Sequence, residues 1–192
     1  MKKYLLLVAF VCISFSSFAQ SSGDYRSAAT GDWNASASWQ MFNGTTWVAA
    51  LAAPSSGGGA ITVVSPHTIT ANSNITADQV LISTGATLNI SSSTFSLEDG
   101  TGTDLVVNGI FIMNGTLSGP GSALINGTLN WTGTLNSATT ISPTGIINLN
   151  NYSGGRLLGG TLTLNGTMNI TGGGISNFGG TLINNGTINK SV

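Results

Sequence analysis

A short motif of Asn, Gly and apolar residues recurs along the second half of the chain at intervals of about twenty residues. The segment 125–133 (INGTLNWTG) returns as 164–172 (LNGTMNITG). The glycines of the motif are spaced by 18, 18, 21 and 20 residues: Gly109, Gly127, Gly145, Gly166 and Gly186. A fixed period of this length is typical of a chain folded as stacked copies of one structural unit.

Within each unit, apolar and small polar residues alternate for four or five positions before the next Gly or Asn, as in 161–164 (TLTL). Such runs, bounded by turn formers, are typical of β-strands. A hairpin meander is the alternative, because Asn-Gly also favours hairpins, but hairpins repeat at about 8–12 residues. The period therefore predicts an all-β, right-handed parallel β-solenoid (β-helix) with coils of about 18–21 residues, its hand following the usual preference of strand crossovers.

Equivalent residues of successive coils stack in such a fold, so the repeat also predicts which side chains share a row. One inward row is expected to hold the residue two positions after the motif glycine: Leu129, Ile147, Met168 and Ile188. One corner is expected to hold the residue before that glycine as a ladder: Asn126, Thr144, Asn165 and Asn185. Trp131 falls in an inward register and is expected in the core.

Composition divides the chain into three parts. Residues 1–20 have a basic start, an apolar run of about half a bilayer span, and a small-x-small site at 17–19, which together predict a cleaved secretory signal peptide. Residues 21–58 are expected to form a Trp-containing N-terminal cap and linker, and residues 59–192 the solenoid. Because 185–189 opens a new coil close to Val192, we expect the C-terminal edge to be continued or covered by further chain.

The leader predicts that the protein is secreted or lies at the cell surface, without a membrane span after cleavage. The only cysteine, Cys12, lies within the leader, so the remaining chain has no disulfide, thiolate metal site or cysteine nucleophile. Cleavage would leave three basic side chains: Arg26, Arg156 and Lys190. No cofactor is expected.

Charge is scarce, at 6% of residues, whereas 41% are hydrophobic and 27 are Gly. Without a basic stripe to neutralise phosphates, nucleic acid is not expected as a partner. The chain is also too apolar for intrinsic disorder. Because no carboxylate side chain follows Asp104, the repeats lack the acid and base of polysaccharide hydrolases, and the chain is predicted not to be an enzyme.

Residues upstream of the repeats carry a family resemblance. Residues 30–39 (TGDWNASASW), followed by Pro54, 61–70 and 80–88 (VLISTGATL), resemble the start of large secreted parallel β-helix proteins of the Bacteroidetes type. Those are adhesin-like surface proteins, often exported through the type IX system, and the opening is also similar to the extracellular domain named for its eight glycines. The resemblance implies a structural or adhesive role, with an extracellular glycan or a host or substrate surface as partner. It also implies a C-terminal sorting domain, absent from this sequence.

Three tryptophans of the predicted cap form the first candidate site: Trp33, Trp39 and Trp47. They predict either an aromatic platform for sugar rings or an apolar lid over the open end of the solenoid. The lid is favoured. His67, in an alternating strand without a partner His or Cys, is expected at the surface or in a turn.

An acidic segment, 98–106 (EDGTGTDLV), resembles one copy of the calcium nonapeptide of β-rolls. Its carboxylates are oxygen ligands of the kind calcium prefers: Glu98, Asp99 and Asp104. Calcium sites of that type need tandem copies, so an acidic turn between two strands is the alternative.

Two further functions stay open. The chain could be the N-terminal, non-catalytic part of a polysaccharide-active β-helix enzyme. Ice binding is a minor alternative, because Thr-x-Thr triplets occur at 68–70, 101–103 and 161–163, although they do not recur in phase at the coil spacing.

Overall fold

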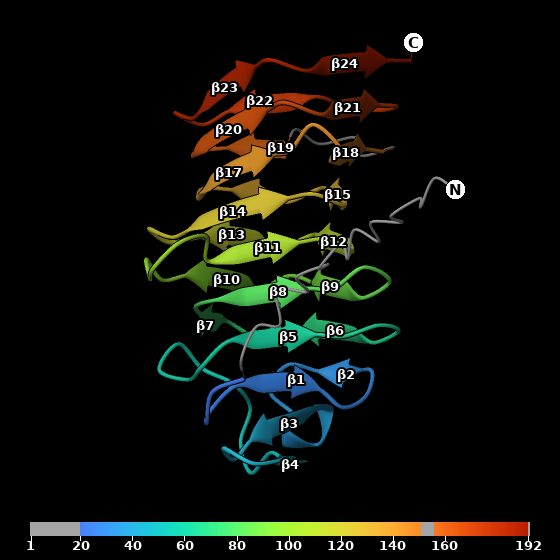
Figure 1. Ribbon diagram of the computed structural model, residues 1–192. Coiled ribbons are helices and arrows are strands. Elements are labelled where there is room, and N and C mark those ends of the chain that lie inside the picture. The colour runs from blue at the N-terminus through green and yellow to red at the C-terminus, as the bar shows by residue number, and fades with distance from the viewer. Residues whose placement is uncertain (1–19, 151–155, 192) are drawn as a thin grey trace, which may run out of the picture.

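The computed structural model describes residues 20–150 and 156–191 and shows an all-β solenoid of about six turns (Figure 1). The predicted signal peptide, apart from Gln20, lies outside these residues. Each turn gives one strand to each of three parallel sheets, so the solenoid has three faces. In the described part of the chain, the 3-10 turn η1 (Ser36–Ser38) is the only helical element, and no helix is long and apolar enough to cross a membrane.

The three sheets run along the solenoid axis. Sheet A contains, in spatial order, β23 (Thr181–Asn184), β20 (Thr161–Leu164), β17 (Ala138–Ile141), β14 (Ser122–Ile125), β11 (Leu105–Val107), β8 (Val80–Ile82), β5 (Ile61–Val63), β1 (Tyr25–Ser27), β3 (Trp39–Phe42) and β4 (Trp47–Ala49). Sheet B contains β2 (Gly31–Asp32), β6 (Thr68–Ala71), β9 (Thr87–Ile90), β12 (Ile110–Met113), β15 (Thr128–Trp131), β18 (Ile146–Leu149), β21 (Thr167–Ile170) and β24 (Thr187–Lys190). Sheet C contains β22 (Ile175–Asn177), β19 (Arg156–Leu158), β16 (Thr134–Leu135), β13 (Thr116–Ser118), β10 (Thr94–Leu97) and β7 (Ile75–Ala77).

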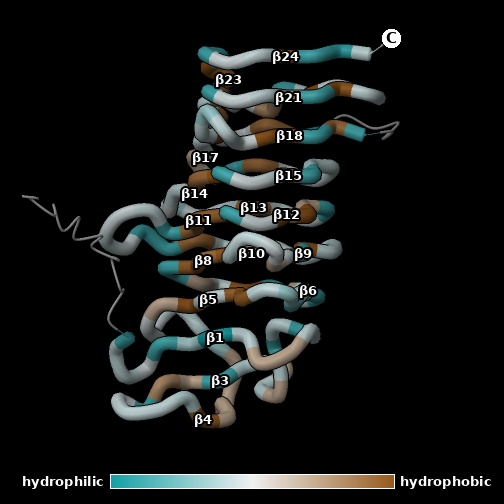
Figure 2. The backbone as a smooth tube through the Cα atoms, turned by 45° about the vertical axis from the view of Figure 1, so that its right-hand side comes forward, coloured by the Kyte–Doolittle hydropathy of each residue, from teal (hydrophilic) through white to brown (hydrophobic). Residues whose placement is uncertain are grey.

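The inward row predicted from the repeat is confirmed in sheet B. Leu129 pairs with Ile147, Ile147 with Met168, and Met168 with Ile188. The first three side chains are fully buried, whereas Ile188 is 40% exposed because β24 is the last described strand of its sheet. Trp131 is also fully buried, as predicted. Figure 2 shows hydrophobic segments recurring on successive coils.

The predicted corner ladder is confirmed in part. Asn126 Nδ2 donates to Asn108 Oδ1 at 2.9 Å, and Asn185 Nδ2 donates to Asn165 Oδ1 at 3.1 Å. Thr144 interrupts the amide ladder, since its shorter side chain donates instead to the backbone oxygen of Asn126.

A second amide ladder, which the repeat did not predict, runs along the outer face of sheet B. Each amide nitrogen donates to the amide oxygen on the preceding coil at 3.0–3.1 Å, through Asn130, Asn148, Asn169 and Asn189. Neutral side chains can stack at one position on every coil, whereas charged ones would repel.

One coil of the solenoid is longer than its two neighbours because it contains the acidic segment, residues 98–106. Leu105 pairs with Ala123, 18 residues later, but Val80 pairs with Leu105, 25 residues later. The additional residues form a loop between β10 and β11, at the corner where sheet C gives way to sheet A. The loop therefore bulges from one corner and leaves the strand register intact.

The ladders begin earlier than the composition predicted. β1 pairs in parallel with β5, and β2 with β6, so residues upstream of 59 already belong to the sheets. The N-terminal edge of sheet A is then covered by β3 and β4, which run antiparallel. An antiparallel hairpin ends the parallel stack and closes that edge.

Two cap tryptophans fill the interior behind this hairpin. Trp33 and Trp39 are 0% and 1% exposed, and their rings meet edge to face at 5.1 Å. Trp33 also packs edge to face on Phe95, at 5.0 Å, and donates Nε1–H to the Pro54 oxygen. Trp39 donates Nε1–H to the backbone oxygen of Trp33 at 2.7 Å. Both rings therefore pack against other aromatic side chains in the interior, and both indole N–H groups donate to backbone oxygens.

Candidate functional site

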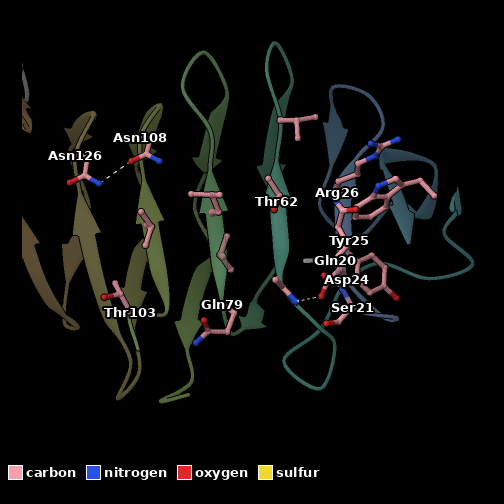
Figure 3. A pocket seen from close by; sticks show the side chains of 16 residues that line it. Gln20, Ser21, Asp24, Tyr25, Arg26, Thr62, Gln79, Thr103, Asn108 and Asn126 are labelled. Atoms are coloured by element: carbon pink, nitrogen blue, oxygen red, sulfur yellow. Dashed lines mark hydrogen bonds between the residues drawn. The ribbon is translucent and has the colours of Figure 1, made fainter. Parts of the chain in front are cut away.

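A groove of about 660 Å³ lies on the outer face of sheet A, across β1, β5, β8 and β11 (Figure 3). Its floor is an outward row of paired residues: Arg26 pairs with Thr62, Thr62 with Leu81, and Leu81 with Val106. These residues alternate with buried neighbours, so they lie on the outside of the sheet. The floor is polar at Arg26 and Thr62 and apolar at Leu81 and Val106.

Neutral polar side chains border this floor on both sides. Asn108 and Asn126 lie toward one end of the strands, and Gln79 and Thr103 toward the other (Figure 3). Amides and hydroxyls both donate and accept hydrogen bonds, and none of these four carries a charge. The groove thus combines an apolar strip with neutral polar walls, as many ligand sites do.

One end of the groove is formed by residues of the cap. The guanidinium carbon of Arg26 lies 4.5 Å from the centroid of the Trp47 ring, and Arg26 Nε donates to Gln40 Oε1 at 2.8 Å. Phe42 packs against Trp47 with ring centroids 5.3 Å apart. Tyr25 also lines this end. A cation held over an indole face is attracted by the ring quadrupole, so this arrangement fixes the position of both side chains.

The three tryptophans proposed as a platform therefore divide between two places. Trp47 is half-buried and lines the groove. Trp33 and Trp39 are enclosed in the cap and have no ring face open to a sugar. Strand alternation explains the division, because Trp39 points inward from β3 while Trp47 pairs with the outward Phe42.

The acidic loop does not assemble the predicted calcium ligands. Asp104 is fully buried, and its Oδ1 accepts the N–H of Gly100 at 3.0 Å. Its Oδ2 accepts the backbone N–H of Ser122 at 2.6 Å and the Ser122 hydroxyl at 3.3 Å. Glu98 and Asp99 are exposed, and no three His, Cys, Asp or Glu side chains of residues 20–150 and 156–191 are grouped so as to hold a metal ion. Asp104 closes the loop and joins it to the next coil.

Asp78 forms a carboxyl pair with Asp104 that sequence reasoning missed. Burial and a hydrogen bond shared with Asp104 raise the pKa of Asp78 above its ordinary 3.8. Burial also acts to raise the pKa of Asp104, but the N–H donors of Ser122 and Gly100 and the bond with Asp78 outweigh it, so that pKa lies below 3.8.

The same pair supports one wall of the groove. Asp78 Oδ1 accepts the backbone N–H of Gln79 at 2.9 Å and its amide Nε2–H at 3.3 Å. Gln79 has φ +52°, the only positive φ of a non-glycine residue in the described part of the chain. A left-handed residue is strained unless its surroundings hold it, and here the Asp78 carboxylate does so.

The pKa directions predict how stability depends on pH. Because the pKa of Asp78 is raised by folding, the folded chain gains stability as pH falls through that pKa toward 3.8. Because the pKa of Asp104 is lowered, its stabilisation is present above 3.8 and is lost as pH falls further. The contribution of the pair is therefore greatest near pH 3.8. Urea-unfolding midpoints measured from pH 7 to pH 3 test this.

In the Asp78→Asn variant, stability should no longer increase between pH 7 and pH 4, since an amide mimics the protonated carboxyl. Stability should still decrease below pH 4, because Asp104 is unchanged. The exposed Asp99, replaced by Asn, is the matched control. Superimposable pH profiles for Asp78→Asn and the native chain would show that the pair has no such effect.

His67 is half-buried and directly follows the turn before β6, in keeping with the expectation of a surface or turn residue, and it contacts Ser27. Its Nδ1 lies 2.9 Å from the Ser27 hydroxyl, which also accepts the backbone N–H of Val64 at 2.9 Å. Ser27 is 2% exposed, so no substrate can reach its oxygen. The Ser27–His67 contact joins β1 to the turn before β6 and is structural.

The Thr-x-Thr triplets do not form one surface. Thr68 and Thr70 lie on β6 of sheet B, Thr161 and Thr163 on β20 of sheet A, and 101–103 in the acidic loop. A threonine column does follow the outer face of sheet B, but Ile110 and Ile146 interrupt it. No unbroken array of paired threonine rows is formed in the described chain.

Comparisons with protein-family models, with curated proteins and with solved structures find no match for this chain. The resemblance of its N-terminal part to Bacteroidetes surface proteins therefore stays a prediction.

Proposed function

We propose that this chain is a non-enzymatic structural or adhesive β-solenoid, secreted or displayed at the cell surface, that binds an extracellular glycan in the groove of sheet A. The observation that carries the proposal is the composition of that groove: a floor that is apolar at Leu81 and Val106, neutral amide and hydroxyl walls, and the half-buried Trp47 ring at one end.

A sugar ring matches these features chemically. Its C–H faces are apolar and pack on aromatic and aliphatic side chains, while its hydroxyls lie around the ring edge and exchange hydrogen bonds with amides and hydroxyls. Leu81 and Val106 supply the aliphatic surface, and Asn108, Asn126 and Gln79 supply amides on opposite sides of it. The groove crosses the strands of successive coils, so an extended oligosaccharide fits along the solenoid axis better than a single compact ligand does.

The carboxyl pair supports binding without catalysis. Glycoside hydrolases hold two carboxyl groups about 5 Å or more apart, with the substrate between them. Asp78 and Asp104 share a hydrogen bond instead, and Asp104 is fully buried with both oxygens accepting backbone N–H groups. The runner-up, the N-terminal non-catalytic part of a polysaccharide-active enzyme, would use the same groove and place catalysis in other residues.

Location rests on the leader and on the resemblance to exported β-helix proteins. N-terminal sequencing of the protein recovered from the culture medium or from intact cell surfaces tests it. A mature chain starting at Gln20 or Ser21 is expected. A protein retained in the cytoplasm with Met1 in place would refute this part of the proposal.

Trp47→Ala is expected to weaken glycan binding about two- to tenfold, because the loss of an aromatic contact costs about 0.5–1.5 kcal/mol. Glycan-array screening of the native protein identifies the ligand, and isothermal titration then measures its affinity for each variant. Leu51→Ala is the matched control, since Leu51 is 97% exposed and apolar but does not line the groove.

Melting temperatures separate binding from folding. The Trp47→Ala variant should melt within a few degrees of the native protein, because the core tryptophans are untouched. Native affinity in the Trp47→Ala variant would contradict the placement of the site. Absence of binding across a broad glycan panel would contradict the proposed function.

A further inference from the structure

We infer that the glycan bound in the groove is acidic, and that the guanidinium of Arg26 binds a carboxylate of one of its sugars. This inference rests on the proposed function and names the ligand class for the same site. It follows from the geometry of Arg26 and from the scarcity of other charges around it.

Arg26 is held in one orientation with its terminal nitrogens unengaged. Nε donates to Gln40 Oε1, and the guanidinium carbon lies over the Trp47 ring. Within the described chain, no hydrogen bond from Nη1 or Nη2 to the protein is found. These two nitrogens form the planar fork that binds a carboxylate through two parallel hydrogen bonds. Because Gln40 and Trp47 already fix the side chain, little conformational entropy is lost when a ligand binds.

Among residues 20–150 and 156–191, Arg26 is also the only cationic side chain that lines the groove. Of the other basic residues that would remain after leader cleavage, Arg156 is buried in the core, and Lys190 lies on β24 in sheet B, several coils away. The remaining walls are neutral amides, hydroxyls and aliphatic groups. A neutral sugar at this end would partly desolvate the guanidinium without pairing its charge, which is unfavourable.

Asp24 is the one acidic side chain among the described residues that line the groove, and both of its oxygens already accept backbone hydrogen bonds. Its Oδ1 accepts the backbone N–H of Ala60 at 2.9 Å, and its Oδ2 accepts that of Ser21 at 2.7 Å. If the leader is cleaved after Gln20, the nitrogen of Ser21 becomes the α-ammonium and pairs with this carboxylate. The charge that remains for a ligand at this end of the groove is then that of Arg26.

A matched pair of ligands tests the inference on the native protein. Oligogalacturonate and its fully methyl-esterified form have the same length and sugar, and differ in whether the carboxylates are free. Isothermal titration, with a chelator present to exclude calcium-mediated association, is expected to show about tenfold or greater preference for the free acid. The preference should shrink as ionic strength rises, because salt screens a half-exposed ion pair.

Variants then assign the preference to Arg26. Arg26→Met should abolish the preference for the free acid, and Arg26→Lys should restore only part of it, because an ammonium lacks the planar fork. Lys190→Met is the control for the loss of one positive charge elsewhere.

The outcomes are distinguishable. Equal affinity for acid and ester overturns the inference and leaves the proposed function standing, whereas no affinity for any glycan overturns both. A preference that survives Arg26→Met overturns the role of Arg26. Tighter binding of a sulfated oligosaccharide than of the uronate overturns the assignment to carboxylate. If Arg26→Met fails to fold, the comparison of ligands on the native protein still decides the ligand class.

Discussion

Replacing Arg156 by methionine is expected to lower the free energy of unfolding by about 3 kcal/mol, because one buried and two partly buried carbonyl groups lose a charged donor. Arg156 is fully buried on β19. Its Nε donates to the oxygen of Trp131 at 2.8 Å, and Nη1 and Nη2 donate to the oxygens of Gly172 and Asn150, each at 3.0 Å. Methionine fills much of the space but donates nothing.

The size of the effect follows from where those carbonyls lie. They belong to β15, to the chain after β18 and to the chain before β22, so a single side chain joins three coils. Chemical denaturation followed by tryptophan fluorescence measures the change, since Trp131 is part of the network. Arg156→Lys should recover only part of the stability, because one ammonium cannot reproduce the spacing of three guanidinium nitrogens. A loss below about 1 kcal/mol for the methionine variant would show that the network contributes little.

Replacing Gly133 by alanine is expected to be comparably damaging, for steric reasons. A Cβ at this position would lie 1.8 Å from the backbone oxygen of Gly115 and 2.8 Å from that of Asn114 on the preceding coil. Backbone cannot move aside as a flexible side chain can, so the two coils must separate locally. Overpacking of a rigid interior costs about 1–3 kcal/mol or more, and the expected loss is at the upper end of that range.

Gly57→Ala provides the matched control for this experiment. A Cβ there meets nothing within 4 Å, and Gly57 lies in the loop before β5. Its effect should stay within about 0.5 kcal/mol, as for most surface substitutions. For a chain of this length, 3 kcal/mol corresponds to a melting-temperature shift of roughly 6–12 °C. Equal melting temperatures for the two alanine variants would refute the close approach of the coils at Gly133.

Much of the fold could be predicted because the repeat spacing determines the register. Once Gly127 is placed over Gly109, the alternation of each strand decides which residues point inward, and Leu129, Ile147 and Trp131 are buried as expected. The Asn126 ladder follows from the same spacing. Such predictions succeed where a residue is surrounded by the equivalent residues of the adjacent coils, since the repeat spacing identifies those residues.

Features made by residues outside the repeat were not predictable in this way. Asp78 meets Asp104 across the coil that contains the inserted loop, where the period is broken. Arg156 occupies an inward position on β19, and no neighbouring residue in the sequence indicates that it would be buried among carbonyls. His67 and Ser27 come from different parts of the chain, and one of them belongs to the cap.

The groove was missed for a related reason. Its residues on β5, β8 and β11 are neighbours through the parallel stack, but Trp47 on β4 is brought beside Arg26 on β1 only when the cap hairpin folds onto sheet A. The tryptophans indicated a site, but the sequence did not reveal that Trp47 alone would face outward. The sequence does not indicate a ligand role for Arg26, because its partners, Gln40 and Trp47, become adjacent to it only through antiparallel pairing.

The position of the groove at the cap end gives the remaining coils a distinct physical role. The groove involves the cap and the coils as far as β14, whereas the strands from β20 onward pair with none of the strands that position its lining residues. Duplicating or deleting one of those distal coils would change the length of the stack by roughly 4.8 Å, the separation of adjacent strands, without altering the groove. The reach of the molecule and its ligand preference can therefore evolve independently, by coil number in one case and by a few cap residues in the other.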